Sequence, residues 1–128
     1  MTSPVPTSDP AFPSHMLDLA ESVCAEYYRL YPDTDERYGG RGRAYCAHDN
    51  AYLAAWIVSA VELGSPATLA QNVQWLADVL AARDFPMDRF VRNLELVADT
   101  VAAGGLAPAA AVESIVRPVA DAILGDGR

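Results

Sequence analysis

The stretch from Arg43 to Gly64 reads RAYCAHDNAYLAAWIVSAVELG, and this stretch decides the fold. Its apolar residues return at helical spacing over about 20 residues. Gly64 follows the last apolar residue, at a position where helices commonly end in a left-handed glycine. The stretch therefore predicts a long central helix over about 43–63.

Shorter helical patterns lie on both sides of this stretch. Upstream, an apolar stripe begins after a capping Ser14 and ends at Pro32, and the segment 33–42, which contains three glycines, is expected to be a polar connector that breaks any helix. Downstream, Pro66, Pro86 and Pro108 each open a further helix, because proline suits the first turn. Since no segment alternates in polarity between hairpin turns, the sequence predicts an all-α fold of about five helices.

Length and composition restrict the class of protein. The 128 residues predict a single domain over 14–125, and the proline-rich segment 1–13 is expected to be a flexible tail. A net charge of −8 disfavours nucleic acid and anionic membrane surfaces as partners. Without a membrane-length apolar run or a secretory signal, a cytoplasmic location is expected. With two cysteines, Cys24 and Cys46, a disulfide framework is improbable, and free buried thiols are expected.

Asp49 is the unusual residue of the central helix. On a helical wheel at about 100° per residue it falls in the middle of an arc formed by Tyr45, Tyr52, Trp56 and other apolar side chains. A buried carboxylate persists only when it is paired or hydrogen-bonded. Asp49 therefore either meets a structural partner from another helix or waits for the N–H groups of a ligand.

Cys46 lies three residues before Asp49, so that their Cβ atoms are about 5–6 Å apart on a shared face. A thiol and a carboxylate at this spacing can touch the same small molecule. His48 points about 200° away from Cys46, which excludes a Cys–His catalytic pair within the helix. Neither a metal site nor a catalytic constellation is recognisable, and the chain is not expected to be an enzyme.

The run Cys46-Ala47-His48-Asp49-Asn50-Ala51-Tyr52-Leu53, with Gly64 at the helix end, resembles the chromophore-carrying helix of the phycobiliproteins. In that family a cysteine is followed two residues later by arginine and three later by aspartate. The resemblance covers about 41–101. It implies a globin-like helical fold and a linear tetrapyrrole (bilin) cofactor. Cys46 would form a thioether to the bilin, and Asp49 would accept hydrogen bonds from its pyrrole nitrogens.

The sequence also departs from that family. The arginine that pairs a bilin propionate is replaced by His48, which is charged only part of the time near neutral pH. Arg41 and Arg43 either supply the missing positive charge or are solvated surface residues. Tyr52 and Trp56 either line the chromophore or pack in the core. The N-terminal helical pair that drives ring assembly in the family looks missing or reduced, so light-harvesting assembly is not expected.

Two functions follow. The first is a light-responsive or pigment-binding module with a small-molecule chromophore attached through Cys46. The alternative is a non-photosynthetic globin-like sensory or protein-interaction domain, which binds another ligand or none and works as a homodimer or with a sensory-pathway partner. A likeness of fold does not decide between them.

Overall fold

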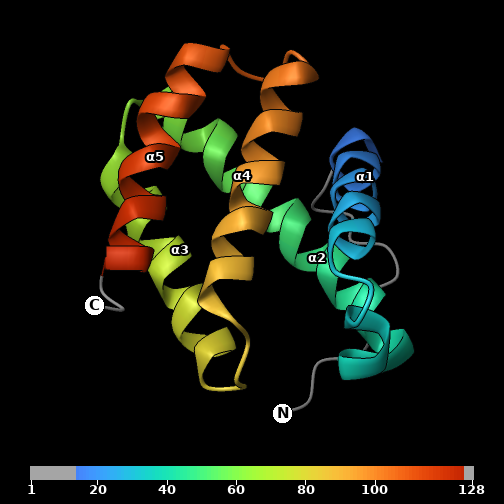
Figure 1. The fold of residues 1–128 in the computed structure, drawn as a ribbon. Coiled ribbons are helices and arrows are strands. Elements are labelled where there is room, and N and C mark those ends of the chain that lie inside the picture. The colour runs from blue at the N-terminus through green and yellow to red at the C-terminus, as the bar shows by residue number, and fades with distance from the viewer. Residues whose placement is uncertain (1–13, 126–128) are drawn as a thin grey trace.

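The structure, a computed structural model, describes residues 14–125 and contains five helices in that range (Figure 1). They are α1 (Ser14–Leu30), α2 (Thr34–Leu63), α3 (Pro66–Ala81), α4 (Met87–Ala103) and α5 (Ala109–Gly125). The described residues form no strand, which confirms the all-α prediction. The predicted tail, 1–13, lies outside the described residues.

The central helix is longer than predicted. α2 begins at Thr34, so the predicted polar connector over 33–42 is wrong for most of its length. Only Gly39 leaves the helical conformation, with φ 69° and ψ −169°, and the helix resumes at the next residue. Glycine is the residue that reaches this positive φ without steric cost. The glycines were expected to break the helix, but they form a kink, because Gly40 and Gly42 keep helical backbone angles.

The ends of the later helices follow the predicted signals. Gly64 ends α2 with φ 62° and ψ 32°, and its N–H lies toward the carbonyls of Ala60 and Val61. Pro66 is the first residue of α3, and Pro86 immediately precedes α4. Pro118 lies inside α5, where it cannot donate a backbone hydrogen bond. Glycine and proline residues therefore mark the ends of these helices.

The core forms around α2 and α4. α2 contacts all four other helices, whereas α1 contacts only α2 and α4. Figure 1 shows α1 (blue) along one edge of the bundle, on the side away from α3 and α5. The largest fully buried side chains come from every helix except α5: Phe90, Leu53, Ile57, Leu69, Leu94, Val23, Val73, Val97 and Val101. α1 therefore touches two other helices, the fewest in the bundle, although its packing against α2 is the most extensive of any pair.

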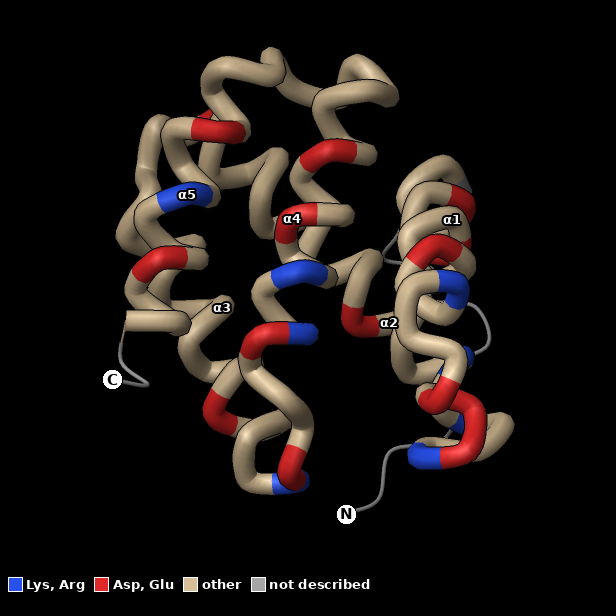
Figure 2. Tube along the Cα trace, viewed as in Figure 1, with Lys and Arg blue, Asp and Glu red and all other residues tan. Residues whose placement is uncertain are grey.

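Arginine side chains are mostly neutralised close to where they lie. Figure 2 shows most of the basic positions beside acidic ones on the same or an adjacent element. The arginine ion pairs join Arg29 to Glu26, Arg37 and Arg89 to Asp33, Arg43 to Asp35, Arg92 to Glu95 and Arg117 to Glu113. Exposed pairs of this kind contribute little to stability, typically about 0–1 kcal/mol each.

Candidate functional site

A partly exposed strip on α2 holds four of the predicted site residues: His48, Asp49, Tyr52 and Trp56. His48 Nδ1 lies 3.4 Å from Asp49 Oδ1. The His48 and Tyr52 rings meet edge to face with centroids 4.8 Å apart, and the Tyr52 and Trp56 rings follow at 6.0 Å. These residues are named here the α2 strip. One carboxylate flanked by three rings is a surface that suits a flat ligand carrying N–H donors.

The prediction that Asp49 lies at the centre of the buried face of α2 is wrong. Its side chain is 34% exposed. The fully buried face of α2 runs through Asn50, Leu53, Ala54, Ile57 and Ala60. Tyr52 and Trp56 stand at the border of this face, because amphipathic rings keep one edge in contact with water. The sequence prediction treated these rings as fully buried. This shifted the expected centre of the buried face by about one residue, from Asn50 to Asp49.

The Asp49 carboxyl is nevertheless poorly solvated for a charged group. Desolvation by its surroundings raises its pKa, and the hydrogen bond and charge of His48, together with the more distant charge of Arg83, offset only part of that effect. A ligand that brings N–H donors or a positive charge would lower this pKa and would itself bind more tightly. Asp49 is therefore the residue of the α2 strip whose charged form a ligand would stabilise most.

Cys46 and Cys24 form a disulfide between α2 and α1, with their Cα atoms 6.0 Å apart. The prediction of free buried thiols is therefore wrong. Sequence spacing alone does not reveal the pair, because the cysteines are 22 positions apart. The segment between them contains the end of α1, a short turn and the kinked start of α2, whose geometry must be known first. In this oxidised state the Cys46 sulfur already has its second covalent partner, so a thioether to a ligand requires the reduced chain.

Asn50 is the buried polar residue that the sequence interpretation missed. It is 1% exposed, and its Nδ2 donates to Cys24 Sγ at 3.2 Å and to Cys46 Sγ at 3.4 Å. The same amide also exchanges hydrogen bonds with Asn93 of α4. A signal was available in the sequence, because Asn50 continues the stripe of Cys46, Leu53 and Ile57 at spacings of three and four.

The two arginines proposed to replace the family's propionate-binding residue lie apart from the α2 strip. Arg43 binds Asp35 through two nitrogens, at 3.2 and 2.9 Å, and its guanidinium stacks over Tyr28 at 4.1 Å. Arg41 is exposed at the surface. Arg43 would have to exchange Asp35 for a ligand carboxylate before it could serve the predicted role.

An aromatic cluster fills the junction between α1, the start of α2 and the turn before α4. The Phe85 ring stacks between Tyr27 and Tyr38, at centroid distances of 6.3 and 5.6 Å. The hydroxyls of Tyr27 and Tyr38 are buried and have no hydrogen-bond partner of normal geometry among the described residues. Burial raises the pKa of Tyr27 to about 12. This cluster anchors the kinked end of α2.

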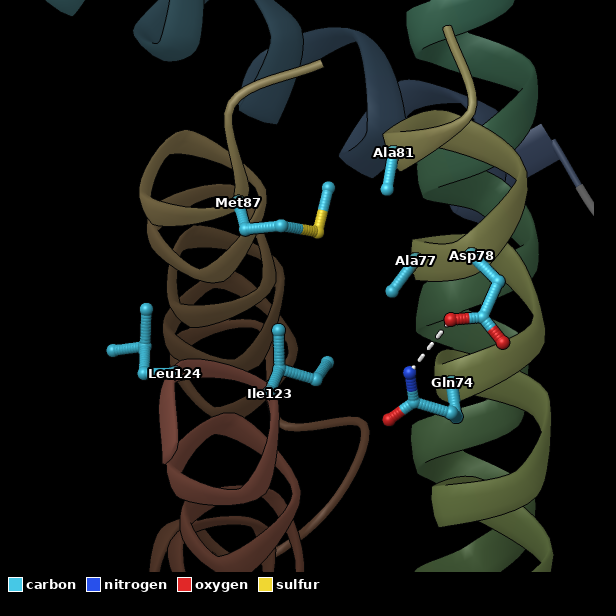
Figure 3. Close-up of a pocket in the computed structure, with 7 residues that line it drawn as sticks. All are labelled: Gln74, Ala77, Asp78, Ala81, Met87, Ile123 and Leu124. Carbon is cyan, nitrogen blue, oxygen red and sulfur yellow. Dashed lines mark hydrogen bonds between the residues drawn. The ribbon is translucent and has the colours of Figure 1, made fainter. Parts of the chain in front are cut away.

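A shallow groove between α3 and α5 offers a second concave surface, and Figure 3 shows its lining. Gln74 and Asp78 are hydrogen-bonded at 2.9 Å on one wall, and Met87, Ile123 and Leu124 form the apolar side. Its volume, about 280 Å³, falls at the lower limit of small-molecule pockets, roughly 300–1,000 Å³. It shares no residue with the α2 strip, and it is too small to enclose a tetrapyrrole.

No protein-family model, curated protein or solved structure matches the chain. None of the helices within residues 14–125 combines the length and the apolar character needed to cross a membrane. Within the same range, no three histidine, cysteine, aspartate or glutamate side chains gather as metal ligands would.

Proposed function

We propose that this protein is a non-enzymatic binding module, and that its α2 strip holds a linear tetrapyrrole. The observation that carries the proposal is the Asp49 carboxylate, which is two-thirds covered and weakly paired and lies in a row with three rings. Pyrrole N–H groups are donors, and a protonated bilin is a cation, so both would compensate the desolvation of this carboxylate. Tyr52 and Trp56 would cover one face of the conjugated system.

The proposed role of Cys46 depends on its oxidation state. In the disulfide form, bilin binding is non-covalent and rests on Asp49 and the rings. In the reduced form, the Cys46 sulfur lies one turn from Asp49 and can add to the ring A side chain of the chromophore. His48 then replaces the family's arginine at the propionate, while Arg41 and Arg43 remain the alternatives from the kinked segment.

The proposal is tested by producing the full chain together with bilin-synthesising enzymes, under reducing and oxidising conditions. The expected result is visible absorbance that survives denaturation only when Cys46 was reduced during assembly. Asp49→Asn should weaken pigment uptake by about tenfold or more, as expected for the loss of a charge-assisted hydrogen bond. Glu62→Gln, at an exposed position of the same helix, is the matched control. If the protein stayed colourless with every common bilin, the proposal would be wrong.

The second candidate is a non-photosynthetic sensory or interaction domain, which works as a homodimer or with a partner protein. Three exposed large apolar side chains favour it: Leu63, Trp75 and Leu124. Trp75 is 62% exposed, and tryptophan is enriched at protein interfaces. Sedimentation velocity of the wild type and of Trp75→Gln should show a concentration-dependent dimer that the variant loses. A strictly monomeric wild type would exclude the homodimer.

A further inference from the structure

We propose that the Cys24–Cys46 disulfide is a reversible redox crosslink that fixes α1 to the bundle, and that Cys46 is the sulfur a dithiol reductant attacks. This inference goes beyond the proposed function, because it concerns the chain without any ligand. It rests on the exposure of the two sulfur-bearing residues, on the neighbours of α1 and on the hydrogen bonds of Asn50.

The two cysteines differ in access. Cys24 is 5% exposed on the inner face of α1, whereas Cys46 lies at the border of the buried face of α2 and is partly exposed. Thiol–disulfide exchange requires a thiolate to reach one sulfur of the bond. The geometry therefore makes Cys46 the point of attack and Cys24 the leaving sulfur.

The exchange balances with a dithiol. A reductant thiolate attacks Cys46 Sγ, the bond between the two sulfurs breaks, and Cys24 leaves as a thiolate that takes a proton from water. The second thiol of the reductant then attacks the mixed disulfide and releases Cys46. The chain gains two electrons and two protons and ends with two thiols, and the reductant ends as a disulfide.

The position of α1 gives the exchange a structural consequence. α1 lies at the edge of the bundle, in contact with α2 and α4 but with neither α3 nor α5, and the disulfide crosslinks it to α2 in addition to the backbone (Figure 1). Its apolar face, which includes Met16, Leu19, Val23 and Tyr27, covers α2 and α4. A helix that contacts only α2 and α4 can separate from the bundle without disturbing α3 and α5, and a crosslink to α2 suppresses that opening.

Asn50 links the sulfurs to the rest of the core. Its Nδ2 shares two hydrogens among three acceptors, the two sulfurs of the disulfide and Asn93 Oδ1, and its Oδ1 accepts from Asn93 Nδ2 on α4. Separation of the two sulfurs removes at least one of these acceptors from Asn50. A change in the oxidation state of the cysteines therefore changes the hydrogen bonding of Asn50 at the contact between α2 and α4, as well as the attachment of α1.

The size of the bundle also favours a reversible role. A bundle of this size buries enough apolar surface to fold without a permanent crosslink. The crosslink is therefore not required for folding, which is consistent with a bond that is opened and closed reversibly.

The test uses the full-length chain in air-oxidised form. Native iodoacetamide labelling should modify neither cysteine before treatment and both after native treatment with dithiothreitol. Amide hydrogen exchange of α1 should then accelerate by about a hundredfold, the size expected when a crosslink closing a loop of this length is lost. Those α5 amides that exchange by local opening should change by less than about threefold, because α5 does not contact α1. Free thiols in the oxidised sample, a disulfide that dithiothreitol reduces only after denaturation, or unchanged α1 exchange would each overturn the proposal.

The assignment of Cys46 as the attacked sulfur has its own test. In Cys24→Ser, oxidised glutathione should modify the remaining Cys46 at least about tenfold faster than it modifies Cys24 in Cys46→Ser, because access limits the exchange. Both variants keep one sulfur and one hydroxyl, so each is the other's control. Equal rates, or faster modification of Cys24, would contradict the assignment. The wild-type exchange experiment requires no variant, so the crosslink proposal is tested even if either variant folds poorly.

Discussion

The side-chain amides of Asn50 and Asn93 hydrogen-bond to each other in both directions, at 3.1 and 2.7 Å. This reciprocal pair joins α2 to α4 at the point where the disulfide joins α2 to α1. A buried amide leaves little choice of partner, because any other packing would strand its polar atoms. The pair therefore fixes the register between the two central helices, which apolar packing alone specifies less strictly.

A double-mutant cycle tests this pair. Asn93→Ala leaves the buried Asn50 amide without its α4 partner and should cost about 1–3 kcal/mol of unfolding free energy. Asn50→Ala should cost a similar amount. The double variant should lose less than the sum, with a coupling energy of about 1–2 kcal/mol. Urea unfolding measures all four proteins, with exposed Gln71→Ala as the control. Additive losses would mean that the two amides do not interact in solution.

The sequence predicted the helices well because their ends are marked by residues with special backbone properties. Gly64 and the prolines at 66 and 86 bound helices where they were expected to. The start of α2 was missed because glycine only weakens a helix, and the helix crosses the segment with a single residue, Gly39, out of helical conformation. Whether the bundle is globin-like is not decided by helix content and stays a prediction.

The candidate site was predicted in part, because residues on one helix have fixed relative directions. His48, Asp49, Tyr52 and Trp56 do form one strip, as helical spacing requires. The disulfide and the Asn50–Asn93 pair depend on how separate helices pack, and single-helix periodicity contains no information about that packing. The burial of Asn50 in place of Asp49 also needed the neighbouring helices, which decide where the border of the buried face lies.

Removal of the disulfide should lower stability without changing the fold. A crosslink that closes a loop of 22 residues restricts the unfolded chain and contributes about 3 kcal/mol. The Cys24→Ala, Cys46→Ala double variant should therefore unfold at a lower urea concentration, with unchanged helix content by circular dichroism. Dithiothreitol should lower the wild-type midpoint toward that of the variant and leave the variant unaffected. An equal effect of dithiothreitol on both proteins would show that it acts elsewhere.

Gly42 and Gly40 should respond to alanine in opposite directions. A Cβ at Gly42 would lie 2.8 Å from Tyr38 Cβ and 2.9 Å from the Tyr28 hydroxyl, and the Tyr38 Cβ cannot move without its backbone. Gly42→Ala should therefore cost about 1–3 kcal/mol through overpacking. A Cβ at Gly40 meets nothing within 4 Å, so Gly40→Ala should gain about 0.5–1 kcal/mol of helix propensity. Thermal unfolding of the two variants provides the comparison, and equal shifts would contradict the close approach at Gly42.

Asp49→Asn should become more stabilising as the pH rises. Desolvation raises the Asp49 pKa in the folded state, so the native chain holds this proton more tightly than the unfolded chain. Stability from this residue is therefore present at low pH and is lost as the pH rises through the raised pKa. Because the side chain is a third exposed, the gain at neutral pH should stay below about 1 kcal/mol.

The matched variant for that experiment is Asp33→Asn, whose effect should have the opposite sign. The hydrogen bond from Arg89 holds the Asp33 pKa below its usual range, so its contribution to stability is present near neutral pH and is lost as the pH falls through that lowered pKa. Urea titrations between pH 3 and 7 should give difference curves that slope in opposite directions for the two variants. Curves of the same slope would contradict the desolvation of Asp49.

Tyr27→Phe should leave stability unchanged at neutral pH or raise it by up to about 1 kcal/mol, because the buried hydroxyl has no hydrogen-bond partner of normal geometry among the described residues. The same burial raises the pKa of Tyr27 to about 12, above its usual value near 10. The unfolded chain therefore releases this proton first, and the wild type should lose stability as the pH rises from about 10 to 12. Tyr27→Phe should lose less over that range. Tyrosinate absorbance near 295 nm follows the titration, and urea unfolding follows stability. A loss above about 1 kcal/mol at pH 7 would mean that the hydroxyl is satisfied in solution, by Arg89 or by a buried water.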